Sequence, residues 1–242
     1  MSVSLQNNQY AYYSKGILYS YLICLPLLLL YELLILISQP DTDYIVRISV
    51  DIWFKTFFDF AGLDAISATL YAAFIIGAII LYQKRSQLKK VKGKYFGLMI
   101  AESAVYAILI SFLISGFLSL IFTMAPGNSL ESLSKLQLFA LSLGAGLYEE
   151  LFFRVILVSL LLYIFNTFFA SKTASYTWAA VVAALLFSGI HYVGEFGDYF
   201  TLSSFLFRFL FGLALNVIYV TRGFGIAAWT HAIYDVIVVM NL

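Results

Sequence analysis

Three ionisable side chains interrupt one long apolar stretch of the sequence. Glu149, Glu150 and Arg154 are the only charged residues between positions 136 and 171. Glu150 and Arg154 lie one helical turn apart with the acid on the N-terminal side, which favours an ion pair between them. Glu149 points about 100° away around a helix, so it needs a different partner. Because a structural ion pair would not need the second glutamate, we expect Glu149 to have a chemical function.

The two histidines of the chain also lie in apolar stretches. His191 ends the run Phe-Ser-Gly-Ile-His at 187–191, and His231 precedes Asp235 by one helical turn. A carboxylate at that spacing can fix the tautomer of an imidazole. Together with the three residues above, these side chains could meet only in a polar cavity inside a bundle of helices.

Such a cavity could hydrolyse a peptide bond. A carboxylate and an imidazole can act as general base towards water, and a second imidazole can stabilise an oxyanion. The sequence lacks the H-E-x-x-H of zinc proteases and the G-x-S-G of rhomboid-like serine proteases. Tyr234-Asp235 matches half of the presenilin-type aspartyl signature, but the G-x-G-D motif that should accompany it is absent.

The motifs E-E-x-x-x-R at 149–154, F-x-x-x-H at 187–191 and H-x-x-x-[N/D] at 231–235 resemble those of the CPBP family. These are the CAAX-processing and bacteriocin-processing membrane proteases, also called Abi. The resemblance covers about residues 96–240 and includes both histidines of the chain. It implies a glutamate-type intramembrane endopeptidase, related to the Ras-converting CAAX endopeptidase, that uses no metal and no cofactor.

The resemblance also implies a role for each motif residue. Glu149 and His191 would activate water, His231 and Asp235 would form the oxyanion side, and Glu150 and Arg154 would hold the shape of the site. The CAAX endopeptidase pattern has Asn where this chain has Asp235. Because an ionised carboxylate repels an oxyanion, we expect Asp235 either to stay protonated or, as we favour, to orient His231 from behind.

Two other functions use the same residue types. A zinc-dependent membrane protease could bind its metal through His191, His231 and Glu149, with an open position for water. A proton-coupled transporter would also bury Glu, His and Arg, although the internal repeat or broken helices typical of transporters are not evident. Some members of the CPBP family are linked to bacteriocin immunity, so a non-enzymatic immunity protein is a further alternative.

The composition indicates an integral membrane protein. Of the 242 residues, 62% are hydrophobic and only 11% are charged, against about 45–50% and 25% in soluble domains. The net charge of +1 gives no basic excess for nucleic acid. We therefore expect the lipid bilayer and a membrane-anchored protein or peptide substrate as partners. A single cysteine, Cys24, excludes an internal disulfide framework.

Several stretches are apolar and long enough to cross a bilayer, which takes about 20 residues. They predict an all-α, polytopic transmembrane helix bundle with about seven spans, over residues 16–38, 65–83, 96–123, 136–166, 174–194, 201–220 and 223–240. Barrel strands would alternate over about ten residues, and no such repeat is present. We expect two parts: 1–95, with the N-terminal spans, and 96–242, the CPBP-like catalytic bundle.

A basic loop predicts the orientation in the membrane. Six of the basic residues are Lys84, Arg85, Lys89, Lys90, Lys92 and Lys94. The positive-inside rule places this loop, and with it the N-terminus, in the cytoplasm. We expect the membrane to be that of a prokaryotic cell.

Residues 44–62 differ from the predicted spans. Arg47, Asp51, Lys55 and Asp59 recur every four residues and form one stripe of alternating charge, while aromatic residues cover the remaining surface. This pattern predicts an amphipathic helix in the outer interface of the membrane, most simply an anchor. Glu32, Glu102 and Arg208 are the other ionisable residues inside predicted spans, and each is isolated in the sequence.

Overall fold

The computed structural model describes residues 9–39, 45–121, 133–194 and 197–240, and within these ranges the chain is all-helical with no strand. The predicted all-α class is therefore confirmed. The N-terminal helices are α2 (Ile17–Ser38), α3 (Ser49–Phe60), α4 (Ala65–Gln83), α5 (Arg85–Leu88) and α6 (Gly93–Ser119). The later elements are α7 (Lys135–Gly144), the π-helices η1 (Ala145–Glu149) and η2 (Leu151–Leu157), α8 (Val158–Phe165), α9 (Lys172–Ile190), α10 (Leu202–Arg222) and α11 (Phe224–Met240).

Each predicted span is helical over most of its described length, but α6 ends at Ser119 and α9 at Ile190, before the predicted ends of the third and fifth spans. Residues 122–123 of the third span lie outside the described residues. Within the described ranges, four helices are long and apolar enough to cross a membrane: α2, α6, α9 and α10. Two shorter apolar helices cover Ala68–Gln83 and Phe224–Met240. The predicted span 136–166 is divided among α7, η1, η2 and α8. The count of seven spans therefore stays a prediction.

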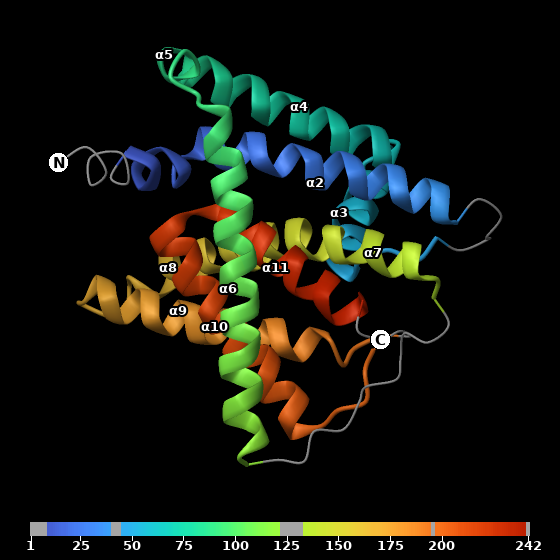
Figure 1. The fold of residues 1–242 in the computed structure, drawn as a ribbon, viewed down its shortest axis with the longest axis vertical. Helices are drawn as coiled ribbons and strands as arrows, with labels where there is room; N and C mark the ends of the chain where they lie inside the picture. The colour runs from blue at the N-terminus through green and yellow to red at the C-terminus, as the bar shows by residue number, and fades with distance from the viewer. Residues whose placement is uncertain (1–8, 40–44, 122–132, 195–196, 241–242) are drawn as a thin grey trace.

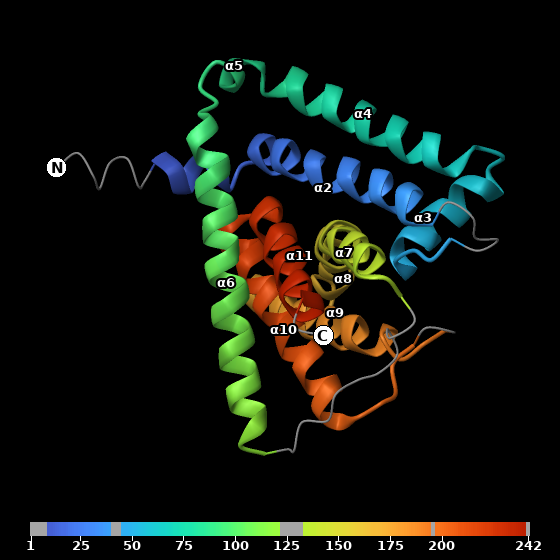
Figure 2. The ribbon, with the colours of Figure 1, turned by 45° about the vertical axis from the view of Figure 1, so that its right-hand side comes forward.

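The helices form two groups joined by α6. Figure 1 shows α6 as a long helix that crosses α2 and runs at a steep angle to both α2 and α4. Figure 2 shows α2 and α4 side by side at one end of the molecule, with α7 to α11 packed together on the other side of α2. The core runs between α2, α7 and α11, and it contains Leu27, Tyr31, Leu143 and Ala228 among its fully or nearly fully buried residues. The three motifs that carry the family resemblance all lie in the α7–α11 group.

Local sequence signals begin and end the helices of this group. Ser134 caps α7 in a capping box with Gln137, which satisfies backbone N–H groups that a helix start leaves unpaired. Thr201 caps α10 by accepting a hydrogen bond from the backbone N–H of Ser204. Gly223 ends α10 at a φ of +89°, and a Cβ there would lie 2.6 Å from the carbonyl oxygen of Lys15. This turn directs the chain into α11, which carries His231.

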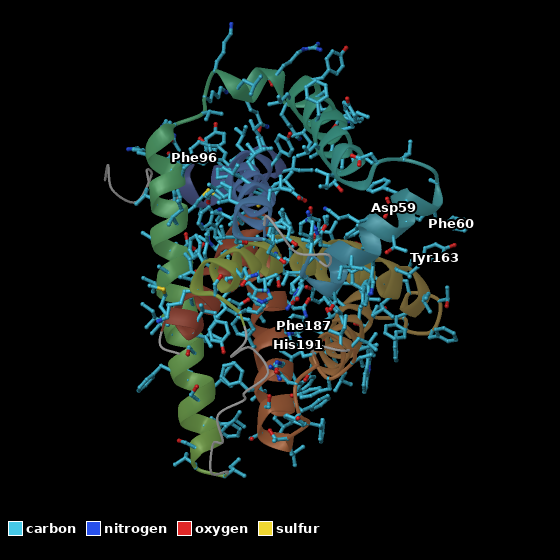
Figure 3. All side chains as sticks on the ribbon, turned by 90° about the vertical axis from the view of Figure 1, so that its right-hand side faces the viewer. Asp59, Phe60, Phe96, Tyr163, Phe187 and His191 are labelled. Carbon is cyan, nitrogen blue, oxygen red and sulfur yellow. The ribbon has the colours of Figure 1, made fainter. Side chains whose placement is uncertain are left out.

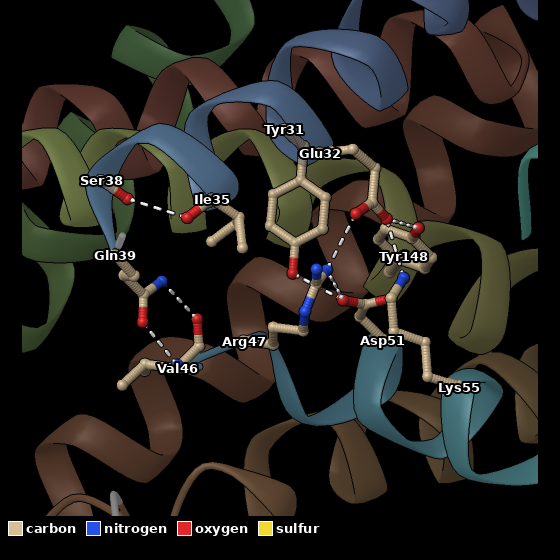
Figure 4. Close-up of polar contacts among 10 residues, drawn as sticks. All are labelled: Tyr31, Glu32, Ile35, Ser38, Gln39, Val46, Arg47, Asp51, Lys55 and Tyr148. Carbon is tan, nitrogen blue, oxygen red and sulfur yellow. Dashed lines mark hydrogen bonds and ion pairs between the residues drawn. The ribbon is translucent and has the colours of Figure 1, made fainter. Parts of the chain in front are cut away.

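Three charges of the stripe face the protein, Asp51 and Lys55 of α3 and Arg47 just before it, whereas Asp59 is exposed. Glu32 of α2 pairs with Arg47 at 3.0 Å and with Lys55 at 2.7 Å. Asp51 pairs with the same two cations at 3.0 and 2.6 Å, and Tyr31 donates a hydrogen bond to it. Figure 4 shows this buried four-charge cluster between α2 and α3. Burial by itself lowers the pKa of Arg47, but the neighbouring carboxylates outweigh it and raise the pKa above its ordinary value.

The aromatic side of α3 points outward. Phe57 and Phe60 are 69% and 91% exposed, and Figure 3 shows Phe60 at the edge of the molecule. The helix itself is confirmed, and its interfacial position stays a prediction. The hydrogen bond from Tyr148 to Glu32 (3.1 Å) and the ring contact between Phe54 and Tyr148 tie the cluster to η1. The charges of α3 therefore hold it against the helix that carries Glu149.

We expect Asp51→Ala to destabilise the protein strongly and Asp59→Ala to leave it unchanged. Asp51 is fully buried between two cations, and breaking such a pair costs about 3–5 kcal/mol. Asp59 is on the same helix but exposed, so its loss should stay within about 0.5 kcal/mol. Thermal unfolding of both variants in detergent measures the difference. Equal melting temperatures would show that the cluster contributes no net stability.

Candidate active site

The E-E-x-x-x-R motif lies where the α7–α8 helix widens into π-helix. The backbone hydrogen bonds of a π-helix run from i to i+5, so each turn holds more residues and neighbouring side chains are rotated less from one another. Glu149 and Glu150 are consequently both buried, at 8% and 0% exposure. Gly146 allows this segment to approach α11 closely, because a Cβ there would lie 2.5 Å from the carbonyl oxygen of Ala228.

Glu150 connects Arg154 and His231. Its Oε1 lies 2.9 Å from Nη1 of Arg154 and 2.8 Å from Nδ1 of His231. The Arg154 guanidinium also donates to the carbonyl oxygen of Gly212 and lies 4.7 Å from the centroid of the Phe187 ring. The predicted Glu150–Arg154 pair is present. Because a carboxylate paired with an arginine only accepts hydrogen bonds, Nδ1 of His231 carries a proton and its Nε2 faces the centre of the site.

His191 follows the last residue of α9 and faces the same centre. Its Nδ1 lies 2.8 Å from the carbonyl oxygen of Phe187, one turn earlier. A carbonyl can only accept, so Nδ1 donates, and the neutral ring presents an unprotonated Nε2 to the site. Figure 3 shows Phe187 and His191 together within the bundle. The rings of Phe187 and Phe211 make T-shaped contacts with the His231 ring, at 5.7 and 5.4 Å between centroids.

Glu149 lies between the two imidazoles. Its Oε2 is 4.0 Å from Nε2 of His191 and 3.9 Å from Nε2 of His231, and it accepts no hydrogen bond from the described residues. Both distances are too long for a direct hydrogen bond. They fit one water molecule that is held by the carboxylate and the rings together. Such a water would have a general base at hydrogen-bonding distance.

Asp235 lies on the open side of the site. Its Oδ2 is 3.5 Å from Nε2 of His231, whereas the hydrogen bond to Nδ1 comes from Glu150. The side chains of Asp235 and His191 are 27% and 26% exposed, against 11% for Glu149 and 3% for His231. A substrate would therefore approach past Asp235 and His191. The position behind His231, which the His-x-x-x-Asp spacing suggested for Asp235, belongs to Glu150.

The structure brings all six predicted site residues together, and it gives the isolated ionisable residues partners. Glu102 pairs with Arg222, and Arg208 pairs with Asp198. The backbone N–H of Asp198 donates to the carbonyl oxygen of His191 at 2.8 Å, so Arg208 fixes the loop that follows His191. Phe211 and Gly212, which also shape the site, carried no recognisable sequence signal. Phe187 is the first residue of the F-x-x-x-H motif, and that motif could have indicated it.

The arrangement does not fit a zinc ion. Tetrahedral zinc with bonds of about 2.0–2.2 Å places its nitrogen and oxygen ligands roughly 3.4 Å from one another. The Glu149 oxygen is 3.9–4.0 Å from either imidazole nitrogen. No group of three or more His, Cys, Asp and Glu side chains in the described part of the chain is arranged to hold a metal.

A comparison with protein-family models finds a match. Residues 131–237 match the family model of the type II CAAX prenyl endopeptidase Rce1-like proteins. The matched region begins just before α7 and contains all six site residues. Comparisons with curated proteins and with solved structures find no significant match.

Proposed function

We propose that this chain is a CAAX-processing (CPBP) protease, because its residues 131–237 match the Rce1-like family model, and that it acts as a glutamate-type intramembrane endopeptidase. Its substrate would be a membrane-anchored protein or peptide. The observation that carries the proposal is the position of the Glu149 carboxylate oxygen, 4.0 and 3.9 Å from the Nε2 atoms of two imidazoles. This triangle can hold and deprotonate one water molecule.

Glu149 and His191 are the groups that activate this water. The water donates one hydrogen bond to Oε2 of Glu149 and the other to the unprotonated Nε2 of His191. Its lone pairs are then free to attack the carbonyl carbon of the scissile peptide bond. Glu149 takes the proton as the oxygen–carbon bond forms. His191 is held in orientation by the hydrogen bond to Phe187.

His231 supports the second half of the reaction. When its Nε2 carries a proton, it donates to the oxyanion of the tetrahedral intermediate. Glu150 holds the ring through Nδ1, and Oδ2 of Asp235 lies 3.5 Å from Nε2. The intermediate collapses when the carbon–nitrogen bond breaks and Glu149 gives its proton to the leaving amine. The products are an amine and a carboxylic acid that keeps the second proton of the water, and Glu149 is regenerated as a carboxylate.

We also propose how the chain is divided into two parts and how it is oriented in the membrane. Residues 96–242 would form the catalytic bundle, and residues 1–95 would add two spans, the interfacial helix α3 and the basic loop. The short apolar helices and the α7–α8 segment would raise the count from four spans to seven. The basic loop and the N-terminus would face the cytoplasm of a prokaryotic cell.

A comparison of two host strains tests the proposed endopeptidase activity. One strain carries the native protein and the other carries Glu149→Ala at the same expression level. Mass spectrometry of membrane proteins then searches for precursors that accumulate uncleaved in the second strain, and the new C-termini in the first identify the cleavage site. If no membrane-associated protein differs between the strains, and purified protein cleaves none of the candidate peptides, the proposal is wrong.

We expect chelators to leave the activity intact. Glu149 and the imidazoles act directly on water in this mechanism, so purified active protein should contain much less than one zinc per chain. Elemental analysis, with activity measured before and after treatment with EDTA and 1,10-phenanthroline, checks this. About one zinc per chain, together with loss of activity on chelation and its recovery on adding zinc, would favour a metalloprotease instead.

A further inference from the structure

A groove lies at the beginning of α6, outside the region of the family match. It has a volume of about 390 Å³, and its lining includes Tyr10, Lys94, Tyr95 and Glu102. Figures 1 and 2 show that the N-terminal segment approaches this end of α6. The groove is far along the chain from the catalytic motifs, and no residue of the proposed mechanism lines it.

The charges at the floor of the groove neutralise each other. Glu102 pairs with the guanidinium of Arg222, and the hydroxyl groups of Tyr10 and Tyr106 donate to its two oxygens. Arg222 also donates to Ser14. This network ties the N-terminal segment to α6 and to the end of α10. Neither Glu102 nor Arg222 therefore offers uncompensated charge to a ligand.

The mouth of the groove is positively charged. Lys94 lines the groove, and Lys92 lies beside it, with their ammonium groups 5.9 and 5.4 Å from the centroid of the Tyr95 ring. Nζ of Lys92 donates a hydrogen bond to Oε1 of Gln9 at 3.4 Å, an uncharged partner. The backbone N–H of Lys92 donates to Tyr19, which fixes the start of the helix. The sequence has no acidic residue between Asp64 and Glu102. An anion is the ligand that this charge would attract.

The remainder of the groove is an apolar stripe below that charge. Lys94, Leu98, Ala101 and Val105 are spaced at i, i+4, i+7 and i+11, so they share one face of α6. Leu98 and Val105 are 48% and 53% exposed. At a rise of 1.5 Å per residue the stripe is about 16 Å long, close to half of the roughly 30 Å hydrocarbon core of a bilayer. That is the depth of one acyl chain in one leaflet.

We propose that this groove binds one anionic phospholipid. The phosphate of the headgroup lies on Lys92 and Lys94, and one acyl chain follows Leu98, Ala101 and Val105. The aromatic rings of Tyr10 and Tyr95 lie at the level of the headgroup, where tyrosine is enriched in membrane proteins. The bound lipid would hold the N-terminal segment against α6, because both line the same groove.

Binding of phosphatidylglycerol to the full-length protein in a neutral detergent tests the proposal, with native mass spectrometry as the measurement. Lys92→Gln with Lys94→Gln should weaken binding about thirtyfold, from the loss of two charges beside the phosphate. The control is Lys89→Gln with Lys90→Gln, which removes two exposed charges from the same loop outside the groove. The control should change binding less than threefold.

Further measurements distinguish lipid binding in the groove from attraction of an anion by charge alone. Ala101→Phe keeps every charge but fills the apolar stripe, so it should also weaken lipid binding at least tenfold. Inorganic phosphate and glycerol phosphate at millimolar concentration should not displace the lipid, and phosphatidylcholine should bind more weakly than phosphatidylglycerol. The proposal is wrong if the two double-lysine variants lose lipid affinity equally, or if Ala101→Phe binds the lipid as well as the native protein does. Displacement of the lipid by free phosphate would also overturn it. The assay uses no peptidase activity, so its outcome is independent of the proposed function.

Discussion

We expect Glu149→Gln to lower the rate of peptide cleavage by roughly 10²–10⁴-fold, the range that general acid–base catalysis contributes. Glutamine has the same shape, but an amide cannot take a proton from water at neutral pH. The substitution should leave folding intact, because Oε2 of Glu149 accepts no hydrogen bond from the described residues and lies at least 3.9 Å from either imidazole. Cleavage of an identified membrane-anchored substrate by purified protein measures the effect.

The matched control is Asp59→Asn, which makes the same change of carboxylate to amide at an exposed position of α3. Its activity and melting temperature should equal those of the native protein. A Glu149→Gln variant that cleaves at near-native rate would refute the general-base role. A variant that loses activity only because it unfolds would be recognised by its lower melting temperature.

The sequence predicted the site well where one helix determines the contact. Glu150 and Arg154 are one turn apart, so their pairing follows from helix geometry alone. The hydrogen bond from His231 to Glu150 joins residues 81 positions apart, and only the packing of α11 against η1 produces it. The spacing of His231 and Asp235 therefore suggested a partner for Nδ1 that the tertiary structure supplies from another helix. Nothing in the residue pattern predicted the π-helical turns that bury both glutamates.

For the fold, too, the sequence predicted the helices better than the contacts between them. Apolar runs located the helices, because each must satisfy its own backbone hydrogen bonds in lipid. The pattern of α3 separated a charged side from an aromatic side but did not determine which side faces the protein. In water the aromatic side of α3 would turn towards the protein. In lipid that side can face outward, and the charged side turns towards the protein only if opposite charges there pair with it. Glu32 of α2 supplies the carboxylate that accepts Lys55 and Arg47.

The second large effect concerns stability. We expect Glu150→Ala to lower the stability by about 3–5 kcal/mol, since it leaves Arg154 as an unpaired buried cation. Glu150 is fully buried, and Arg154 is 1% exposed. The loss of the hydrogen bond to His231 adds to the effect. For a chain of this size the melting temperature should fall by roughly 10 °C, together with the yield of folded protein. Glu149→Ala should instead fold well and be inactive.

The double variant Glu150→Ala with Arg154→Leu separates the two functions of Glu150. No charge is stranded in it, so the melting temperature and the yield should recover most of their native values. Activity should not recover, because Nδ1 of His231 still lacks the acceptor that holds the ring. Thermal unfolding in detergent and cleavage assays on the same preparations measure both. If Glu149→Ala proves unstable while Glu150→Ala is stable and inactive, the two glutamates have the opposite roles, and Glu150 would be the general base.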